Sequence, residues 1–215
     1  MKNLLFIVCF IFLSTGSFSQ NISKDDLSFL RQKEDSLKDY AVGIIQDSID
    51  YRRFQSDSIF TKMFVRALKT PYSFYYPFDS LQTISIIYAP DSSFRVFTWQ
   101  LVINEELTIQ HGAIQMNMPD GLLKLFPLID KTEKIKEPQD TVTDNKTWIG
   151  AVYYRIIEKQ NDGKNYYTLL GYDENTIFST KKLIDVLTFE DGKPVFGGPY
   201  FNFDDNDTLI KRKKN

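Results

Sequence analysis

The sequence contains very few of the residues that build disulfides, metal centres and proton relays. Among 215 residues there is one cysteine, Cys9, and one histidine, His111. Because Cys9 falls in a stretch that we interpret below as a signal peptide, we expect the mature chain to have no disulfide, thiol nucleophile or cysteine metal site. A single imidazole also excludes a two-histidine metal site within one chain. We therefore predict no metal and no cofactor.

The chain also lacks a strong charge of either sign. It has 26 Lys and Arg against 28 Asp and Glu, a net charge of −2, and a sequence pI of about 5.5. Because a nucleic-acid binder usually carries a basic patch, we predict no nucleic-acid partner. Apolar residues make up 42% and charged residues 25%, which is typical of a globular protein. The sequence has no phosphate-binding glycine loop, no Gly-x-Ser-x-Gly elbow and no zincin motif.

Residues 1–19 have the three-part pattern of a secretory signal peptide. Lys2 supplies a positive charge, Leu4–Leu13 is an uncharged apolar run, and Ser17-Phe18-Ser19 places small residues at the two positions that signal peptidase reads. The run is too short to span a bilayer. The sequence before Cys9 lacks the small residue of a lipoprotein signal. We predict cleavage after residue 19 and an exported protein, periplasmic or extracellular, with no membrane span in the mature chain.

Residues 20–71 are predicted to form a helical N-terminal segment. Apolar residues recur at helical spacing over 22–50, and Ser23 with Asp26 resembles a capping box. A second apolar stripe follows Ser56 and Asp57, either of which can cap a second helix that ends before Pro71. Each helix presents one apolar stripe, so both helices are expected to pack on another part of the chain.

Residues 72–203 are predicted to form an antiparallel β domain. Asp-Gly pairs at 162–163 and 191–192 are strong hairpin signals. The polar stretch 130–146 predicts an exposed loop within the domain. The fold class is therefore α+β, with two N-terminal amphipathic helices packed on an antiparallel, meander-like sheet. Residues 204–215 form a polar and basic tail.

Some strands have an apolar pattern that simple alternation does not explain. The phase shifts within 94–101, which favours a bulge or burial on both faces, and it slips near Gly112, a second candidate bulge. Both faces of the strand over 149–157 are largely apolar, which is typical of a strand covered on both sides. The two helices can cover one face, and the sequence does not identify what covers the other. Residues 121–129 and 181–189 fit either a helix or a strand.

Several of these segments together resemble a group of uncharacterised exported proteins of Bacteroidetes bacteria. The resemblance covers residues 55–200 or so, and it rests on these segments: Ala67–Phe74, Phe94–Trp99, Trp148–Ile157, Tyr166–Asp173, Lys181–Phe189 and Gly192–Gly197. The group has no established activity, so the resemblance implies no catalytic residues. Members of the group continue with further β sequence after the Gly-Lys-Pro-Val-Phe-Gly segment. We therefore expect this chain, which ends at Asn215, to be a shorter member.

No acidic or histidine motif in the sequence forms a convincing catalytic or metal site. A catalytic His111 would need a nucleophile or an orienting carboxylate, and none is evident, so we interpret it as structural. Turn formation explains the turn carboxylates better than glycosidase chemistry. The segment Asp204–Thr208 lacks the glycine and distal glutamate of a calcium loop. The turn carboxylates are Asp91, Glu105, Glu106, Asp173 and Glu174.

Aromatic residues are the most promising candidates for ligand binding. The chain has 18 Phe, 12 Tyr and 2 Trp, and such side chains can form a platform for sugars or an interface. Adjacent tyrosines on a strand point to opposite faces, so one of each pair is expected in the core and the other on the surface. The candidate ligand-binding residues are Trp99, Trp148, Tyr154 and Tyr166.

Three functions remain open from the sequence. The first is a non-catalytic envelope or secreted module that binds an unidentified envelope ligand or protein partner through an aromatic surface. The second is a hydrolase of envelope glycan or lipid, which requires a concave pocket with His111 or two facing carboxylates. The third is a shortened family member without independent activity, which predicts an unpaired apolar sheet edge or open face near 183–203.

Overall fold

A computed structural model describes residues 22–176 and 179–201. The predicted signal peptide, the basic tail and the acidic segment Asp204–Thr208 lie outside the described residues. Within the described part, two α-helices precede two antiparallel sheets, and this confirms the predicted α+β class. The elements are α1 (Lys24–Gln46), α2 (Asp50–Leu68), η1 (Ser73–Tyr75), β1 (Ser85–Tyr88), β2 (Phe94–Val102), β3 (Thr108–Met116), β4 (Lys124–Ile129), η2 (Thr132–Lys134), β5 (Thr143–Asp144), β6 (Val152–Asn161), β7 (Lys164–Thr176), β8 (Ser179–Glu190) and β9 (Lys193–Phe196).

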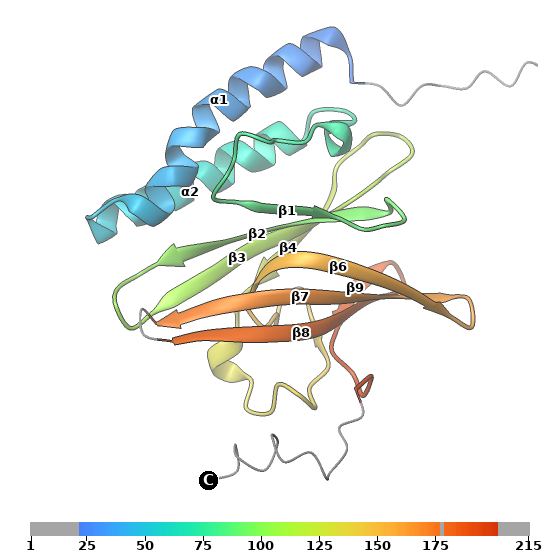
Figure 1. Cartoon of the computed structure of the whole chain (residues 1–215). Coiled ribbons are helices and arrows are strands. Elements are labelled where there is room, and N and C mark those ends of the chain that lie inside the picture. The colour runs from blue at the N-terminus through green and yellow to red at the C-terminus, as the bar shows by residue number, and fades with distance from the viewer. Residues whose placement is uncertain (1–21, 177–178, 202–215) are drawn as a thin grey trace, which may run out of the picture.

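The strands form two sheets rather than one, and the molecule has three layers. Sheet 1 has the order β1-β2-β3-β4, and sheet 2 has the order β5-β9-β8-β7-β6. Figure 1 shows α1 and α2 on one side of sheet 1 and sheet 2 on the other. Sheet 1 is therefore covered on both faces.

The first core lies between the helices and sheet 1. Along β2, Phe97, Trp99 and Leu101 point to the helices, as the two-residue period of a strand requires. They pack with Phe60 and Phe64 of α2, whose stripe follows the helical period. The predicted packing of both helices on the sheet is confirmed.

The second core lies between the two sheets. The prediction that the strand over 149–157 is covered on both faces is wrong, because β6 packs on sheet 1 with one face and carries the exposed Tyr154 and Ile157 on the other. Phe94 and Val96 of β2 point away from the helices and pack against Tyr153, Leu169 and other residues of sheet 2. Each sheet thus covers the other, so β2 is apolar on both faces because both faces are buried. A single sequence shows that a strand has two buried faces, but it does not show which element buries each of them.

The helices confirm the sequence signals at two of their four ends, the start of α1 and the end of α2, while α1 stops four residues before the predicted residue 50. Ser23 caps α1 by accepting a hydrogen bond from the Asp26 backbone N–H at 3.1 Å. α1 ends at Gln46, inside the predicted range, and α2 ends at Leu68, shortly before Pro71. The predicted start of the second helix at residue 56 or 57 is wrong, because α2 begins at Asp50 without a side-chain cap.

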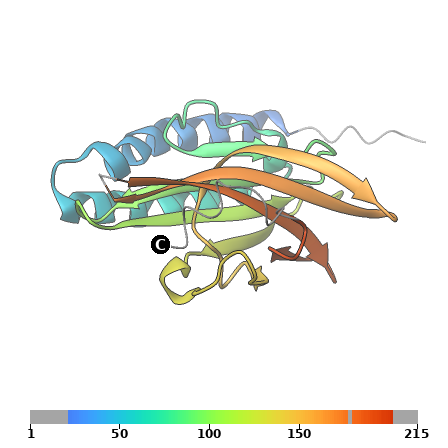
Figure 2. The ribbon, with the colours of Figure 1, turned by 60° about the horizontal axis from the view of Figure 1, so that its bottom comes forward.

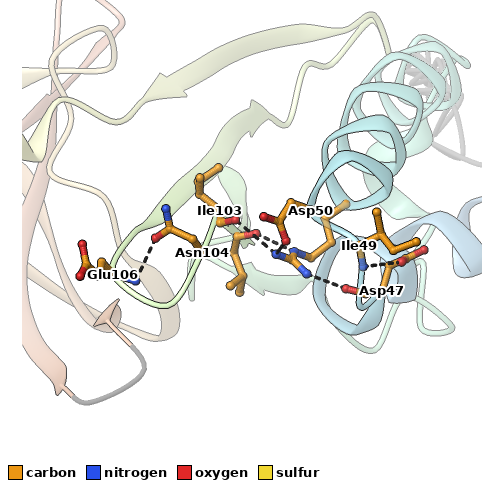
Figure 3. Close-up of polar contacts among 8 residues, drawn as sticks. Asp47, Ile49, Asp50, Ile103, Asn104 and Glu106 are labelled. Carbon is orange, nitrogen blue, oxygen red and sulfur yellow. Dashed lines mark hydrogen bonds and ion pairs between the residues drawn. The ribbon is translucent and has the colours of Figure 1, made fainter.

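A buried arginine fixes the corner between the two helices. Arg53 donates to the Val102 carbonyl oxygen at 2.7 Å, to the Asp47 carbonyl oxygen at 2.7 Å and to Asp50 Oδ1 at 2.6 Å, and it also reaches the Ile103 carbonyl oxygen at 3.2 Å. Figure 3 shows Asp47 and Asp50 at this corner facing Ile103 of the β2–β3 turn. Because these acceptors lie far apart in the sequence, the early start of α2 depends on tertiary contacts.

The two bulges favoured by the sequence are absent from the described β2–β3 pairing. The register runs without a break from Phe94 opposite Met116 to Val102 opposite Thr108. Gly112 is needed for a different reason: a Cβ there would lie 2.7 Å from the Phe97 carbonyl oxygen. A register shift does occur at Tyr154 in β6, between Tyr153 and Arg155.

The structure also defines the predicted turns and the two segments that fit either a helix or a strand. The Asp-Gly pairs connect β6 to β7 and β8 to β9, and both residues of each pair have positive φ, as a type I′ turn requires. Residues 124–129 and 181–189 are strands. The segment 130–146 is mostly loop with the short elements η2 and β5. Among the described helices, none is long and apolar enough to cross a membrane.

Candidate functional site

The candidate site is the face of sheet 2 that points away from sheet 1, called here the outer face. Paired residues on neighbouring strands share a face. Leu169 is buried against sheet 1, so Leu170 and its partners Arg155 and Ile184 lie on the outer face. Three apolar side chains are strongly exposed there: Tyr154 (52%), Ile157 (42%) and Ile184 (63%). Figure 2 shows the β6–β7 hairpin of this sheet extending past the helices.

Two tyrosines and a lysine form the centre of the outer face. Lys182 Nζ lies 5.7 Å from the Tyr154 ring centroid and 5.2 Å from that of Tyr172. The bulge in β6 places Tyr154 beside Tyr172, although Tyr172 is paired with Val152. Burial raises the pKa of Tyr172, and the nearby Glu174 carboxylate raises it further. The two rings therefore share one cation, which lies within cation–π distance of each.

The outer face continues along the sheet with basic and aromatic residues. Lys159 is paired with Tyr166, and Arg155 is paired with Leu170. The Tyr166 ring lies 5.4 Å from the Tyr200 ring, at an interplanar angle of 69°. At the far end, Lys164 Nζ lies 3.2 Å from Glu190 Oε1. The middle of the outer face thus combines cations with exposed rings.

The structure separates the four predicted ligand-binding residues into two pairs. Tyr154 is exposed and Tyr166 is half-buried on the outer face, and their role in binding stays a prediction. Trp99 and Trp148 are 5% and 0% exposed, so their proposed place on a ligand-binding surface is wrong. Each lies on an inward-facing side of the fold, and each indole N–H donates to a neighbour there.

Trp99 belongs to a polar contact between α2 and sheet 1. Its Nε1 donates to Asp57 Oδ1 at 2.9 Å, and His111 Nδ1 lies 2.9 Å from the same oxygen. Asp57 supplies the orienting carboxylate that the sequence did not reveal. Among the described residues Asp57 is the one hydrogen-bond partner of the His111 ring, so no hydroxyl nucleophile is bonded to that ring. This arrangement supports the structural interpretation of His111.

A second polar group, the inter-sheet cluster, lies between β2, β3 and β7. It consists of Gln100, Gln110, Asp130, Asp173 and Glu174. Gln110 Nε2 donates to Asp173 Oδ1 at 2.9 Å, and Gln100 Nε2 donates to Glu174 Oε2 at 2.7 Å. Asp173 and Glu174 were predicted in a turn, and this is wrong because β7 continues to Thr176. The sequence signal that could have revealed this cluster is the pair of glutamines, Gln100 and Gln110, within otherwise apolar strands.

Two acids of the inter-sheet cluster line one cavity of about 360 Å³. Asp130 accepts hydrogen bonds from the backbone N–H of Gln110 and from the backbone N–H and hydroxyl group of Thr132, at 3.0, 2.9 and 2.7 Å. Burial raises the pKa of Asp173, and the Asp130 and Glu174 carboxylates raise it further, while Gln110 and Lys181 act in the opposite direction. Two lysines of the 130–146 loop, Lys131 and Lys134, also line the cavity.

A larger cavity, of about 790 Å³, lies between the 130–146 loop and β8. β9 pairs only with the Leu187–Glu190 end of β8, so the loop faces the other end of that strand. Asp185 lines this cavity and accepts a hydrogen bond from the Tyr153 hydroxyl group at 3.2 Å. Burial raises the pKa of Asp185 to about 6. Sequence analysis missed Asp185 and Lys182, because only the pairing of β8 with β7 gives them their positions.

Comparison with known proteins yields no match to this chain among protein-family models, curated proteins or solved structures. The resemblance to exported Bacteroidetes proteins therefore stays a prediction. In the described part of the chain, no group of three or more His, Cys, Asp or Glu side chains is arranged to hold a metal ion.

Proposed function

We propose that this protein is an exported, non-catalytic binding module whose outer face binds an acidic glycan of the cell envelope. One observation carries the proposal: Lys182 lies within cation–π distance of both the exposed Tyr154 ring and the Tyr172 ring on a hydrogen-bonded sheet. Rings of this kind stack on the apolar faces of sugars, and a lysine pairs with a carboxylate or sulfate group. Strand residues are also held rigidly, so little side-chain entropy is lost on binding.

The charges of the outer face favour a glycan over a protein partner. The cores of protein interfaces are poor in charged residues and especially in lysine. Here Lys182 lies at the centre, and Arg155 and Lys159 lie on the same face. Its exposed apolar residues, Ile157 and Ile184, are not paired with each other: Ile157 is paired with Thr168, and Ile184 is paired with Leu170, whose other partner is Arg155. A ligand with alternating anionic and apolar surfaces complements this arrangement.

The test is binding of the mature chain to polygalacturonate, with dextran as the neutral comparison, by affinity gel electrophoresis and calorimetry. We expect retardation by polygalacturonate only. Tyr154→Ala should weaken binding about tenfold, or about 1.4 kcal/mol. Lys182→Gln should weaken it and reduce its dependence on salt. Tyr51→Ala is the matched control, because Tyr51 is 72% exposed on α2, away from sheet 2.

Three results would contradict the proposal. Equal binding to polygalacturonate and dextran would show that the basic side chains of the outer face do not contribute to binding. Equal loss of affinity in Tyr154→Ala and Tyr51→Ala would show that the outer face is not the site. Binding to vesicles of anionic lipid, without binding to either glycan, would identify a membrane surface as the partner.

A second candidate function is hydrolysis of the same glycan at the cavity of about 360 Å³. The specific observation is that Asp130 and Asp173 both line this cavity. Glycoside hydrolysis needs one protonated and one ionised carboxyl group. Burial raises the pKa of Asp173, which is the direction that a general acid requires. The release of reducing ends from polygalacturonate, abolished by Asp173→Asn, would establish this function. If no reducing ends are released, glycan binding without hydrolysis stays the proposed function.

A further inference from the structure

We propose that the open edge of β8 binds an acidic peptide in extended conformation, which adds a strand to sheet 2. The open edge is defined here as the backbone of residues 180–184 on the side of β8 opposite β7. The inference concerns this backbone and the cavity beside it, and it does not depend on glycan binding at the outer face.

The pairing of β8 leaves the first part of the strand without a neighbour on one side. β7 pairs with β8 as far as Leu187, whereas β9 pairs with it only from Leu187 to Glu190. In the part of the chain that the structure describes, no other strand pairs with β8. Such an edge presents backbone N–H and C=O groups that act as a template for a further strand.

The hydrogen bonds of the sheet show which backbone groups face the open edge. The Val186 carbonyl oxygen accepts a hydrogen bond from the Gly197 backbone N–H at 2.9 Å, so the backbone groups of Val186 point to the β9 side. Because this direction alternates along an antiparallel strand, those of Lys182 and Ile184 point the same way. Among the described residues, neither has a backbone hydrogen bond to the 130–146 loop. Both residues are exposed, so a peptide can reach these groups.

The cavity of about 790 Å³ gives an added strand room, and its lining favours certain side chains. It lies between this edge and the 130–146 loop, and Ile135, Ile149 and Leu183 line it. Leu183 is paired with Gly171 and packs against the second core, so it lies on the face toward sheet 1. Every second side chain of an added strand would lie on that apolar side, and the others would lie on the outer face beside Lys182.

The charges around the cavity favour an acidic partner over a second copy of the chain. Two aspartates line it, Asp173 and Asp185, and each already accepts a hydrogen bond from a neighbouring side chain. An antiparallel pair of two β8 edges would bring lysines of both copies together, and like charges on paired strands are destabilising. A peptide of alternating acidic and apolar residues instead complements both the cations and the apolar lining. The lysines that line the cavity are Lys136, Lys181 and Lys182.

The test is calorimetric titration of the mature chain with a short, capped peptide of alternating valine and glutamate, compared with a valine–lysine peptide of equal length. We expect saturable binding of the acidic peptide only, and weaker binding at high salt. Two N-methylated forms of the acidic peptide test the edge itself. In an antiparallel pair the glutamates share the face of Lys182 and Ile184, so their N–H groups donate to β8. Methylation of the glutamate nitrogens should weaken binding at least about tenfold, and methylation of the valine nitrogens should not.

Two pairs of protein variants locate the binding site. Ile184→Pro removes a backbone N–H that faces the open edge, a change that an edge strand tolerates, and it should weaken binding at least about tenfold. Ile184→Thr keeps that N–H and is the matched control. Lys136→Gln should weaken binding and reduce its dependence on salt, whereas Lys62→Gln, on α2, should bind as the parent does. The methylated peptides test the edge even if Ile184→Pro does not fold, which a thermal melt would show.

Four outcomes would overturn the inference. The first is the absence of saturable binding by the parent protein, or equal binding of the acidic and basic peptides. The second is an equal effect of the two methylation patterns. The third is undiminished binding by a folded Ile184→Pro protein, which would place the peptide elsewhere, such as the edge of β6. The fourth is self-association in sedimentation analysis that the peptide disrupts, which would assign the edge to a second copy. Lys182 is unchanged in every variant, so glycan binding can succeed or fail independently.

Discussion

Arg95 provides the sharpest test of the physical account of this fold. It is the second residue of β2 and is 0% exposed, yet among the described residues it has no carboxylate partner. Its guanidinium group donates to the carbonyl oxygens of Ser73 and Tyr76, to Gln115 Oε1 and to the Tyr88 hydroxyl group, at 2.7–2.9 Å. Four rings surround it, those of Phe74, Phe78, Tyr88 and Phe97, at 4.7–5.5 Å from Cζ.

We predict that Arg95→Met lowers the free energy of unfolding by about 4 kcal/mol. Methionine fills much of the volume but leaves two buried oxygens, the Tyr76 carbonyl oxygen and Gln115 Oε1, without a donor, each costing about 1–3 kcal/mol. It also removes one of the two hydrogen bonds to the Ser73 carbonyl oxygen, which keeps the one from the Tyr76 backbone N–H. Relief of the buried charge offsets part of this cost. That charge is costly, since burial lowers the pKa of Arg95 to about 10. For a chain of this size the melting temperature should fall by about 8–16 °C.

The assay is urea unfolding followed by circular dichroism, together with a thermal melt. The midpoint should move while the m-value stays constant, which shows that the loss is in native-state stability. The free energy of unfolding of Arg95→Lys should lie between those of the parent and of Arg95→Met, because an ammonium group keeps the charge but not the planar arrangement of donors. Arg155→Met, on the outer face, is the matched control and should change stability by less than about 0.5 kcal/mol. An Arg95→Met protein within about 1 kcal/mol of the parent would refute the reasoning.

Two further predictions concern Asp185 and the helix corner. The pKa of Asp185 is raised from 3.8 to about 6 in the folded state, so its contribution to stability is present below pH 4 and is lost as the pH rises through 6. Between pH 4 and pH 7, the free energy of unfolding of Asp185→Asn should therefore rise by about 2–3 kcal/mol relative to that of the parent, as measured by urea unfolding. If the difference in stability between the two proteins does not change with pH, the raised pKa of Asp185 is contradicted. Arg53→Gln should cost about 2 kcal/mol by the same method, because it removes the hydrogen bonds to Asp47 and Val102. The exposed neighbour Arg52 serves as the control. A similar loss of stability in Arg52→Gln would contradict this explanation.

Local sequence signals determined the elements of this protein and many of their ends. Ser23 caps α1 because its side chain reaches a backbone N–H only three residues away. Asp162 and Asp191, each followed by glycine, specify turns because both turn residues need positive φ. The paired apolar stripes of the helices determined that they pack on the sheet. These signals act over a few residues, so the sequence alone displays them.

The arrangement of the sheets, and with it the candidate site, was decided by tertiary structure. The apolar pattern of β2 required two buried faces, but long-range pairing determined that helices cover one face and sheet 2 covers the other. That choice buried Trp99 and Trp148 and left Tyr154 on the surface. It also placed Lys182 near the rings of Tyr154 and Tyr172 and brought Gln110 to Asp173, contacts that join different strands. The alternation of side chains along a strand determines which face of the sheet a residue lies on. Which element packs against that face is determined only by the packing of the layers.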